Sequence, residues 1–356
     1  MMGFILRILL TGGCGFIGSA VVRFAIKNLG YEVINVDKMT YAASKDALED
    51  VLLHPNHTLL TLDICDSESI RAAFAKYQPD AVMHLAAESH VDRSIDGPCA
   101  FVQTNVNGTF VMLEAAREYF ATLVGEKRER FRFHHISTDE VFGALADEDP
   151  PFNEQTPYDP RSPYSASKAA SDHLARAWMH TYGLPIIVSN TTNNYGKWQF
   201  PEKLIPLMII NGINEAPLPI YGGGTNTRDW LFVDDHAEAL LKIITHGIPG
   251  QTYCIGARQP RKNLDVVKTI CAVLDQKLPS PNGARERLIT YVKDRPGHDH
   301  RYEIDPSFAE NALHWKAAHD FERGLTVTIE WYLNNCEWWE RIRSQTYGGQ
   351  RLGTIA

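Results

Sequence analysis

Tyr164 and Lys168 are spaced so that they could act together as a base. Residues four apart share one face of a helix. A free tyrosine titrates near ~10, but a nearby ammonium and a positively charged nicotinamide ring would both favour the phenolate. The phenolate could then take the proton of an alcohol while hydride leaves the carbon. Many amphipathic helices carry a Tyr and a Lys at this spacing, so the pair predicts chemistry only together with other signals.

A second candidate group, Thr138-Asp139-Glu140, follows the predicted strand 131–137. The hydroxyl could hydrogen-bond a reacting oxygen, and two adjacent acids could supply further proton transfers, one as acid and one as base. The alternative is an exposed pair on a turn. In a straight strand Asp139 would point away from Thr138 and Glu140. If both acids serve one substrate, the backbone must therefore leave the strand at about Thr138.

The glycines Gly13, Gly15 and Gly18 fit the pattern G-x-G-x-x-G. Such glycines permit a tight turn, close approach to a pyrophosphate and close helix–strand packing, and the following helix N-terminus attracts phosphate. A strand before the loop and a helix after it are both predicted, which is the context that the motif requires. Asp37 ends the next strand and could accept hydrogen bonds from ribose hydroxyls, which favours NAD over NADP. The adjacent Lys38 could tolerate a phosphate.

These groups must be positioned by alternating strands and helices, which predict a parallel sheet covered on both faces with right-handed crossovers. The pattern becomes irregular after about residue 190. We therefore expect a doubly wound α/β domain at 1–190 and 229–256, and a smaller, irregular α/β substrate-binding domain at 191–228 and 257–356. The predicted strands are 5–10, 32–36, 58–61, 81–84, 131–137 and 185–189, and the predicted helices are 18–28, 67–77, 99–120, 165–182, 234–245, 264–274 and 325–334.

The bulk composition narrows the class of protein. A net charge of −8 argues against a nucleic-acid partner. No apolar run is long enough to span a bilayer, and the short apolar start resembles a first strand rather than a signal peptide. Six scattered cysteines without a C-x-x-C pair predict reduced core residues in a cytoplasmic protein. The histidine spacings lack a matching ligand set, so no metal site is expected.

The combination of glycine loop, strand-end hydroxyl and Tyr-x-x-x-Lys resembles the extended short-chain dehydrogenase/reductase family, whose sheet is of the Rossmann type. The chain is more closely similar to the dTDP-glucose 4,6-dehydratases along nearly its whole length. The segments that carry this resemblance are 36–41, 84–92, 137–143, 162–168, 193–196, 200–206, 228–230 and 294–298.

The resemblance implies a reaction sequence on a nucleotide-bound glucose. Tyr164 would deprotonate the hydroxyl on carbon 4 with Thr138 bonding that oxygen, and NAD would take the hydride. Glu140 would remove the proton on carbon 5, and Asp139 would protonate the hydroxyl that leaves carbon 6 as water. Hydride returns to carbon 6, giving a 4-keto-6-deoxy sugar nucleotide for deoxysugar biosynthesis. The resemblance also implies a homodimer.

The same resemblance assigns the remaining site residues. The cofactor would be held by Gly12, Gly15, Phe16, Ile17, Gly18, Asp37, Lys38, Thr40, Asp63, Ile64, Leu85, Ala86, Ala87, Ser89, Thr104, Tyr164, Lys168 and Asn194. The substrate would be held by Ser89, Thr138, Asn193, Lys203, Leu204, Pro219, Tyr221, Arg228, Asn263, Asp294, Arg295 and His298.

The chain departs from the family pattern at a few positions, and these leave alternatives open. Phe142 stands where a Tyr is usual, and 42–44, 191–192, 197 and 225–227 also differ. Another nucleotide-glucose could therefore be the substrate. A UDP-sugar epimerase or decarboxylase would not need Asp139 and Glu140. A non-catalytic NAD-sensing scaffold would not need Thr138, Tyr164 and Lys168.

Overall fold

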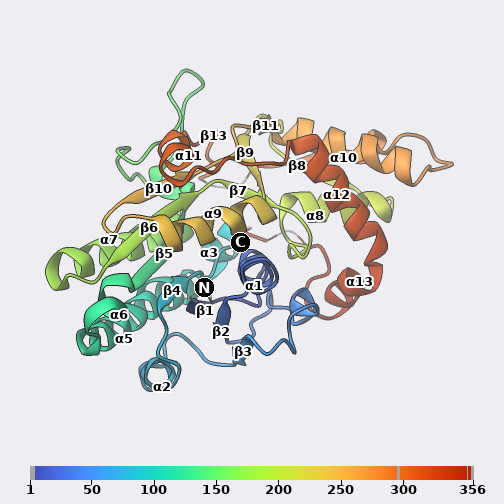
Figure 1. Cartoon of the computed structure of the whole chain (residues 1–356). Coiled ribbons are helices and arrows are strands. Elements are labelled where there is room, and N and C mark those ends of the chain that lie inside the picture. The colour runs from blue at the N-terminus through green and yellow to red at the C-terminus, as the bar shows by residue number, and fades with distance from the viewer. Residues whose placement is uncertain (1–4, 295–296, 351, 354–356) are drawn as a thin grey trace.

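The core of the molecule is a parallel sheet of seven strands in the order β10-β6-β5-β4-β1-β2-β3 (Figure 1). The computed structural model describes residues 5–294, 297–350 and 352–353. This arrangement confirms the predicted doubly wound α/β fold. It also adds β10, a short strand that the sequence analysis did not predict. The strands are β1 (Arg7–Thr11), β2 (Glu32–Val36), β3 (His57–Leu60), β4 (Ala81–His84), β5 (Arg132–Thr138), β6 (Ile186–Thr191) and β10 (Thr252–Ile255).

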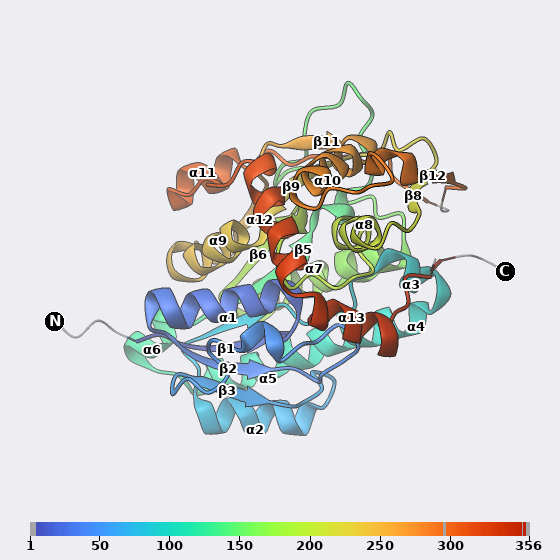
Figure 2. The ribbon, with the colours of Figure 1, turned by 90° about the vertical axis from the view of Figure 1, so that its right-hand side faces the viewer.

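Helices cover both faces of this sheet because alternate strand residues point to opposite faces. In β1, Ile8 and Leu10 join the apolar cluster formed with α1 (Phe16–Leu29) and α9 (Val233–His246). Leu9 joins the cluster on the other face with α2 (Ser67–Tyr77), α5 (Thr109–Thr122) and α7 (Pro163–Tyr182). Figure 2 shows α1 on one side of β1 to β3 and α2 on the other.

The single helix predicted over 99–120 is interrupted. It consists of α4 (Pro98–Phe101), a π-helical stretch η2 (Val102–Gly108) and then α5. Within η2, the Asn105 amide accepts from the backbone N–H of Glu88 and donates to the Glu88 carbonyl and the Ser167 hydroxyl. The wider turn thus ties α4 and α5 to the segment after β4 and to α7. Such stretches often occur at functional sites, and helical periodicity alone could not reveal this one.

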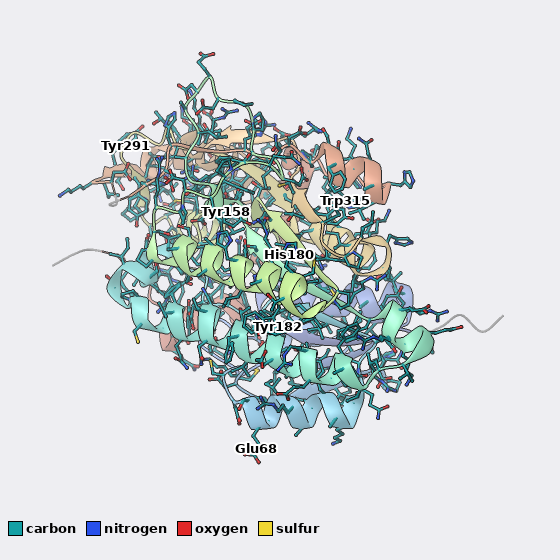
Figure 3. All side chains as sticks on the ribbon, turned by 90° about the vertical axis from the view of Figure 1, so that its left-hand side faces the viewer. Glu68, Tyr158, His180, Tyr182, Tyr291 and Trp315 are labelled. Atoms are coloured by element: carbon teal, nitrogen blue, oxygen red, sulfur yellow. The ribbon has the colours of Figure 1, made fainter. Side chains whose placement is uncertain are left out.

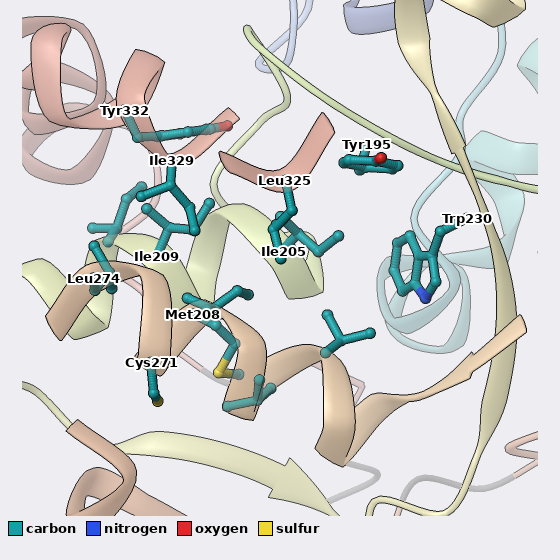
Figure 4. Packing of buried hydrophobic residues seen from close by; sticks show 14 of the residues in the cluster. Tyr195, Ile205, Met208, Ile209, Trp230, Cys271, Leu274, Leu325, Ile329 and Tyr332 are labelled. Atoms are coloured by element: carbon teal, nitrogen blue, oxygen red, sulfur yellow. The ribbon is translucent and has the colours of Figure 1, made fainter. Parts of the chain in front are cut away.

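A smaller region lies at one end of the large sheet. Its strand β9 (Thr227–Phe232) pairs with β7 (Asn193–Tyr195), β11 (Pro260–Lys262) and β13 (Arg301–Tyr302), and β8 (Leu218–Tyr221) pairs with β12 (Ile289–Val292). Helices α8 (Leu204–Ile213), α10 (Asn263–Lys277), α12 (Phe321–Asn334) and α13 (Cys336–Gln345) contribute to a separate apolar core. Figure 4 shows side chains of that core, among them Met208 of α8, Leu274 of α10 and Ile329 of α12.

The remaining elements are short. They are helices α3 (Val91–Asp96), α6 (Gly125–Arg130) and α11 (Ser307–Leu313), and the 3-10 turns η1 (Asp46–Leu48), η3 (Asp139–Phe142) and η4 (Arg285–Leu288). Among the described residues, no helix is both long and apolar enough to cross a membrane. The cysteines are not all core residues as predicted, because Cys99 is exposed and Cys65 and Cys336 are half-buried.

Candidate active site at the carboxyl ends of the strands

A cavity of about 320 Å³ lies where β1, β4, β5 and β6 end, at the edge where open α/β sheets bind ligands. It is lined by Thr138, Asp139, Glu140, Tyr164 and Lys168 together with nearly every residue predicted to hold the cofactor. Asp63 is the exception. Its carboxylate accepts from the backbone N–H of Cys65 and lies 3.3 Å from the Lys38 ammonium. The cation that follows Asp37 in the sequence is therefore directed at Asp63.

The glycine loop has the shape that a dinucleotide phosphate requires. Gly12 has a φ of +77°, and a Cβ there would lie 2.8 Å from the Ala86 nitrogen. A Cβ on Gly18 would lie 2.0 Å from the Gly12 carbonyl oxygen, so the helix could not approach the strand as it does. A Cβ on Gly15, which also lines the cavity, would lie 3.3 Å from the Gly12 carbonyl oxygen. No described side chain caps α1, which leaves its N-terminal N–H groups available to an anion.

Asp37 lines the same cavity at the end of β2. Its carboxylate accepts from the backbone N–H groups of Cys14 and Met39 at 2.9 and 2.8 Å. Burial raises its pKa, although these two hydrogen bonds oppose the shift. Each carboxylate oxygen retains a further lone pair, so the group can still accept from a ribose hydroxyl.

The backbone leaves the strand where the acid pair requires it to. β5 ends at Thr138, and Asp139–Phe142 form the 3-10 turn η3. The Thr138 hydroxyl accepts from the backbone N–H of Glu140 at 3.3 Å, so the turn and the hydroxyl are fixed together. Both acids line the cavity, as the prediction of a break at Thr138 required. The alternative of an exposed pair is wrong for Asp139, which is 1 % exposed.

Asp139 is held in its protonated form. Burial, aided by the negative charge of Glu140, raises its pKa to about 8, although Arg228 and a hydrogen bond with Thr192 oppose the shift. One oxygen, Oδ2, is buried without a hydrogen-bond partner among the described residues. A carboxylic acid that is neutral near pH 7 and opens on a cavity can donate a proton to a leaving group.

Tyr164 and Lys168 lie on one face of α7, near the end of β5. The phenol hydrogen-bonds Thr138, and the Lys168 ammonium donates to the Ile136 carbonyl at 2.8 Å. The expected lowering of the phenol pKa is not achieved by the chain alone. Burial and the negative charge of Glu140 raise the pKa of Tyr164, and the Thr138 hydrogen bond only partly opposes them. Further positive charge beside the ring is needed before the phenol can act as a base.

The predicted substrate residues fall into two groups. Ser89, Asn193 and Lys203 line the cavity with Thr138, and the Lys203 ammonium donates to the Ser89 carbonyl at 2.9 Å. The second group, Leu204, Pro219, Tyr221, Arg228, Asn263, Asp294 and His298, does not line it. Arg295 lies outside the described residues.

Members of the second group are nevertheless held by organised contacts, and one of them, Arg228, acts on a cavity residue. Arg228 is buried over the ring of Tyr302 and donates to the Asp299 carbonyl. Its positive charge acts to lower the pKa of Asp139. Asp294 and His298 are paired at 2.6 Å, with the Tyr221 ring beside the imidazole. The side-chain oxygens of Asn193 and Asn263 are buried without a partner among the described residues. Such orphaned oxygens suit donors from a ligand.

Sequence reasoning missed part of the cavity lining. Several missed residues fall inside the segments that carry the family resemblance, so the signal was present but was not assigned to the site. Thr192 was noticed only as a departure, although its hydroxyl contacts Asp139. The missed lining residues are Val36, Ala42, Ala43, Leu62, Glu88, Ile136, Ser137, Thr191, Thr192, Gln199, Phe200 and Glu202. Among the described residues, no cluster of three or more potential metal ligands occurs.

A parallel Rossmann-type sheet with a tyrosine, a lysine and a strand-end hydroxyl at its carboxyl edge defines an enzyme of the extended short-chain dehydrogenase/reductase class. Residues 9–328 match the family model described as GDP-mannose 4,6 dehydratase, and the chain belongs to this family.

Individual relatives are similar over almost the entire chain. A dTDP-glucose 4,6-dehydratase of Escherichia coli is 55 % identical, covering 98 % of this chain and 100 % of the relative. The crystal structure of a dTDP-glucose 4,6-dehydratase from Streptomyces venezuelae with NAD and TYD bound has a TM-score of 0.87 at 38 % identity, covering 95 % of this chain and 100 % of that one. A UDP-glucose 4-epimerase of Thermotoga maritima with UDP-glucose gives a TM-score of 0.81 at 26 % identity, covering 93 % and 100 %.

Proposed function

We propose that this protein is an NAD-dependent lyase that converts dTDP-glucose to dTDP-4-keto-6-deoxyglucose. The observation that carries the proposal is Asp139, a buried acid whose pKa of about 8 keeps it protonated beside Glu140. An enzyme that only oxidises or epimerises carbon 4 has no use for a proton donor and a second carboxylate at this point. The 55 % identity to a named dTDP-glucose 4,6-dehydratase and the NAD-bound structure at 38 % identity support the same assignment.

NAD would be held by the glycine loop, the N-terminus of α1 and Asp37, with Lys168 and Tyr164 at the reacting end. When bound, NAD supplies a hydride acceptor and donor for the sugar and a positive charge beside the phenol. The Asp37 carboxylate would accept from ribose hydroxyls, and it would repel a phosphate on the same ribose.

The first step assigned to the chain's own residues is removal of a proton from the hydroxyl on carbon 4. Tyr164 would accept this proton, and Thr138 would hydrogen-bond the same oxygen because its hydroxyl contacts the phenol. Lys168, fixed by the Ile136 carbonyl, would favour the phenolate through its charge.

Elimination would then use the acid pair. The ketone formed at carbon 4 acidifies the proton on carbon 5, and Glu140 would remove it. Asp139 would donate its proton to the hydroxyl leaving carbon 6, so that water departs. The two adjacent carboxyl groups can take opposite roles because burial keeps Asp139 protonated.

The nucleotide end would be bound by members of both groups of substrate residues. Lys203 and Arg228 offer cationic donors for a pyrophosphate, and the unpaired oxygens of Asn193 and Asn263 can accept from hydroxyl or amide groups of the ligand. Positions 197 and 225–227, which differ from the family pattern, flank this region. The preferred nucleotide base is therefore determined by direct measurement.

Product analysis with dTDP-, UDP-, CDP- and GDP-glucose tests the proposal. We expect the 4-keto-6-deoxy product, detected by the absorbance of its enolate in alkali, to form most rapidly from dTDP-glucose. Faster turnover of another nucleotide-glucose would retain the reaction and change the substrate. A 4-epimer or a decarboxylated product would refute the assignment as a dehydratase.

We also propose a division of the chain into a cofactor domain, 1–190 and 229–256, and a nucleotide-sugar domain, 191–228 and 257–356. The position of β10 in the large sheet and the separate apolar core of α8, α10 and α12 support it. Strand β9 crosses the boundary at 229.

A cytoplasmic homodimer is proposed as the working form. Exposed apolar side chains on η2, α5 and α7, namely Val102, Phe110 and Tyr182, support a partner surface there. Tyr182 is labelled in Figure 3 on α7, beside α5. Sedimentation should give twice the mass of one chain, and Phe110→Asp should give single chains.

A further inference from the structure

Behind the catalytic tyrosine and lysine lies a polar network that the proposed mechanism does not use. Its centre is Asp172, a carboxylate with 0 % exposure on α7. Tyr164, Lys168 and Asp172 follow one another at intervals of four residues, so they form a line along one face of this helix. The first two open on the cavity, whereas Asp172 does not line it.

The Asp172 carboxylate joins the end of β5 to α7. Its Oδ1 lies 3.0 Å from Nε2 of His135, and its Oδ2 accepts from the Ser137 hydroxyl at 2.8 Å. These residues flank Ile136, whose carbonyl accepts the hydrogen bond of the Lys168 ammonium at 2.8 Å. Any displacement of Asp172 would therefore move the acceptor of Lys168.

Two further contacts extend the network to Thr138. The Tyr158 hydroxyl donates to Asp172 Oδ2 at 2.9 Å, and Figure 3 shows Tyr158 beside α7. The Asn190 amide lies 3.3 Å from the same oxygen and donates to the Thr138 carbonyl at 3.0 Å. The carboxylate thus fixes the backbone of the residue whose hydroxyl contacts the Tyr164 phenol.

We propose that Asp172 is a positioning residue that supplies the buried negative charge needed to keep Lys168 as an ammonium and holds the end of β5 in register with α7. This inference rests on the proposed role of Lys168 in the reaction. A buried ammonium is stable only with a compensating charge or hydrogen bonds, and Lys168 is 5 % exposed.

The nearby histidines, Arg176 and Tyr164 do not replace that function. His84 of β4, whose ring lies 5.6 Å from that of His135, and His135 itself are kept neutral because burial lowers the pKa of each imidazole. Arg176, one turn beyond Asp172, is cationic and donates to the Tyr158 hydroxyl. Tyr164, one turn before Lys168, is protonated because burial raises the pKa of its phenol.

The titration behaviour of the two partners agrees with this role. Burial alone would raise the pKa of Asp172, but hydrogen bonds from His135 and Ser137 and the charge of Lys168 hold it below its usual value. Burial lowers the pKa of Lys168, and Asp172 opposes this shift. Removing the negative charge would therefore leave burial unopposed at the lysine.

The test measures the protonation of Lys168 in cofactor-free protein. Acetic anhydride acylates only the neutral amine, so the labelling rate of Lys168 against pH, read by peptide mass spectrometry, reports its pKa. In Asp172→Asn the midpoint should fall by about one unit or more, which is at least ~10-fold faster labelling at pH 7. Tyr158→Phe, the matched control, removes a hydrogen bond to Asp172 but keeps the charge and should not move the midpoint. An unchanged midpoint in Asp172→Asn would overturn the proposal.

A stability measurement covers the case in which Asp172→Asn does not fold. Lys168→Met combined with Asp172→Asn removes both charges, and this double variant should recover a cooperative thermal transition. If the double variant is as unfolded as the single one, the carboxylate is needed independently of the lysine and the proposal is wrong. Neither measurement uses turnover, so a failure of the dehydratase assignment would leave both results interpretable.

Discussion

Asp139 lines the cavity and Asp172 does not, and both are almost completely buried, yet the protein shifts their pKa values in opposite directions. Asp172 has hydrogen-bond partners in His135, Ser137 and Tyr158, and its pKa is lowered. Asp139 has a long contact with Thr138, a hydrogen bond with Thr192 and an unpaired Oδ2, and burial raises its pKa to about 8.

The comparison teaches that burial alone does not determine the charge of a carboxyl group. Hydrogen-bond donors and a nearby cation stabilise the carboxylate, and their scarcity leaves the neutral acid. The network behind β5 is thus built to hold a fixed negative charge, whereas the cavity side is built to hold a proton that can be given away.

Tyr164→Phe should have the largest effect on turnover, because it removes the proton acceptor of the first step. The loss expected for a general base is about 10² to 10⁴-fold, measured as the rate of oxidation at carbon 4. Stability should change little, since the ring remains packed against Phe101. Near-normal turnover would mean that Tyr164 only packs the helix.

Asp139→Asn tests the cavity side of the comparison. Oxidation and exchange of the carbon 5 proton should persist, while loss of water should slow by about 10²-fold because the proton donor is gone. In the parent, water loss should fall as pH rises through about 8, where Asp139 loses its proton. A variant with unaltered elimination would remove Asp139 from the reaction.

The stability of Asp139→Asn relative to the parent should depend on pH. The pKa of Asp139 is raised on folding, so its stabilising contribution is complete below the unfolded value near ~4 and is lost as pH rises through about 8. Asparagine cannot ionise, so the variant should be more stable than the parent at pH 8 by about 1 kcal/mol or more. Thermal unfolding at pH 5 and pH 8 provides the measurement.

Glu140→Gln distinguishes the two adjacent acids. Exchange of the carbon 5 proton with deuterated solvent should fall by about 10²-fold, because the proton acceptor is lost. The retained exchange in Asp139→Asn is the matched control. Exchange in Glu140→Gln at the rate of the parent would remove Glu140 from the reaction, and unaltered elimination in Asp139→Asn as well would show that the acid pair serves only the turn.

Asp37 is intermediate between Asp139 and Asp172. It accepts hydrogen bonds from two backbone N–H groups, as a stabilised carboxylate does, but burial still raises its pKa. Asp37→Ala should weaken NAD binding by about 10 to 100-fold, the value of one or two hydrogen bonds to a charged group. Titration of the cofactor-free protein would measure it. Equal binding of NADP and NAD by the parent would contradict the role given to Asp37.

Much of the cofactor side could be predicted because its signals are local. The glycine spacing, Asp37 at a strand end and the exit of the backbone at Thr138 each follow from short-range rules, and the structure places these residues on one cavity. The π-helical stretch η2 could not be predicted, because it depends on the contact of Asn105 with Glu88.

The network around Asp172 could not be predicted for a similar reason. Its partners come from β5, β6 and the segment before α7, which only the folded sheet brings together. The protonation of Asp139 likewise depends on burial, which no local pattern reveals. The second group of substrate residues was assigned from resemblance, and the structure does not place it on the wall of the cavity.

The central claim is that one molecule of sugar nucleotide is oxidised and then reduced within a single closed site. Substrate carrying deuterium on carbon 4 should give product with that deuterium in the methyl group at carbon 6. A mixture of labelled and unlabelled substrate, distinguished by a second isotope in the sugar, should show no crossover between molecules and no accumulation of free NADH. Deuterium that is lost to solvent or shared between molecules would contradict the account.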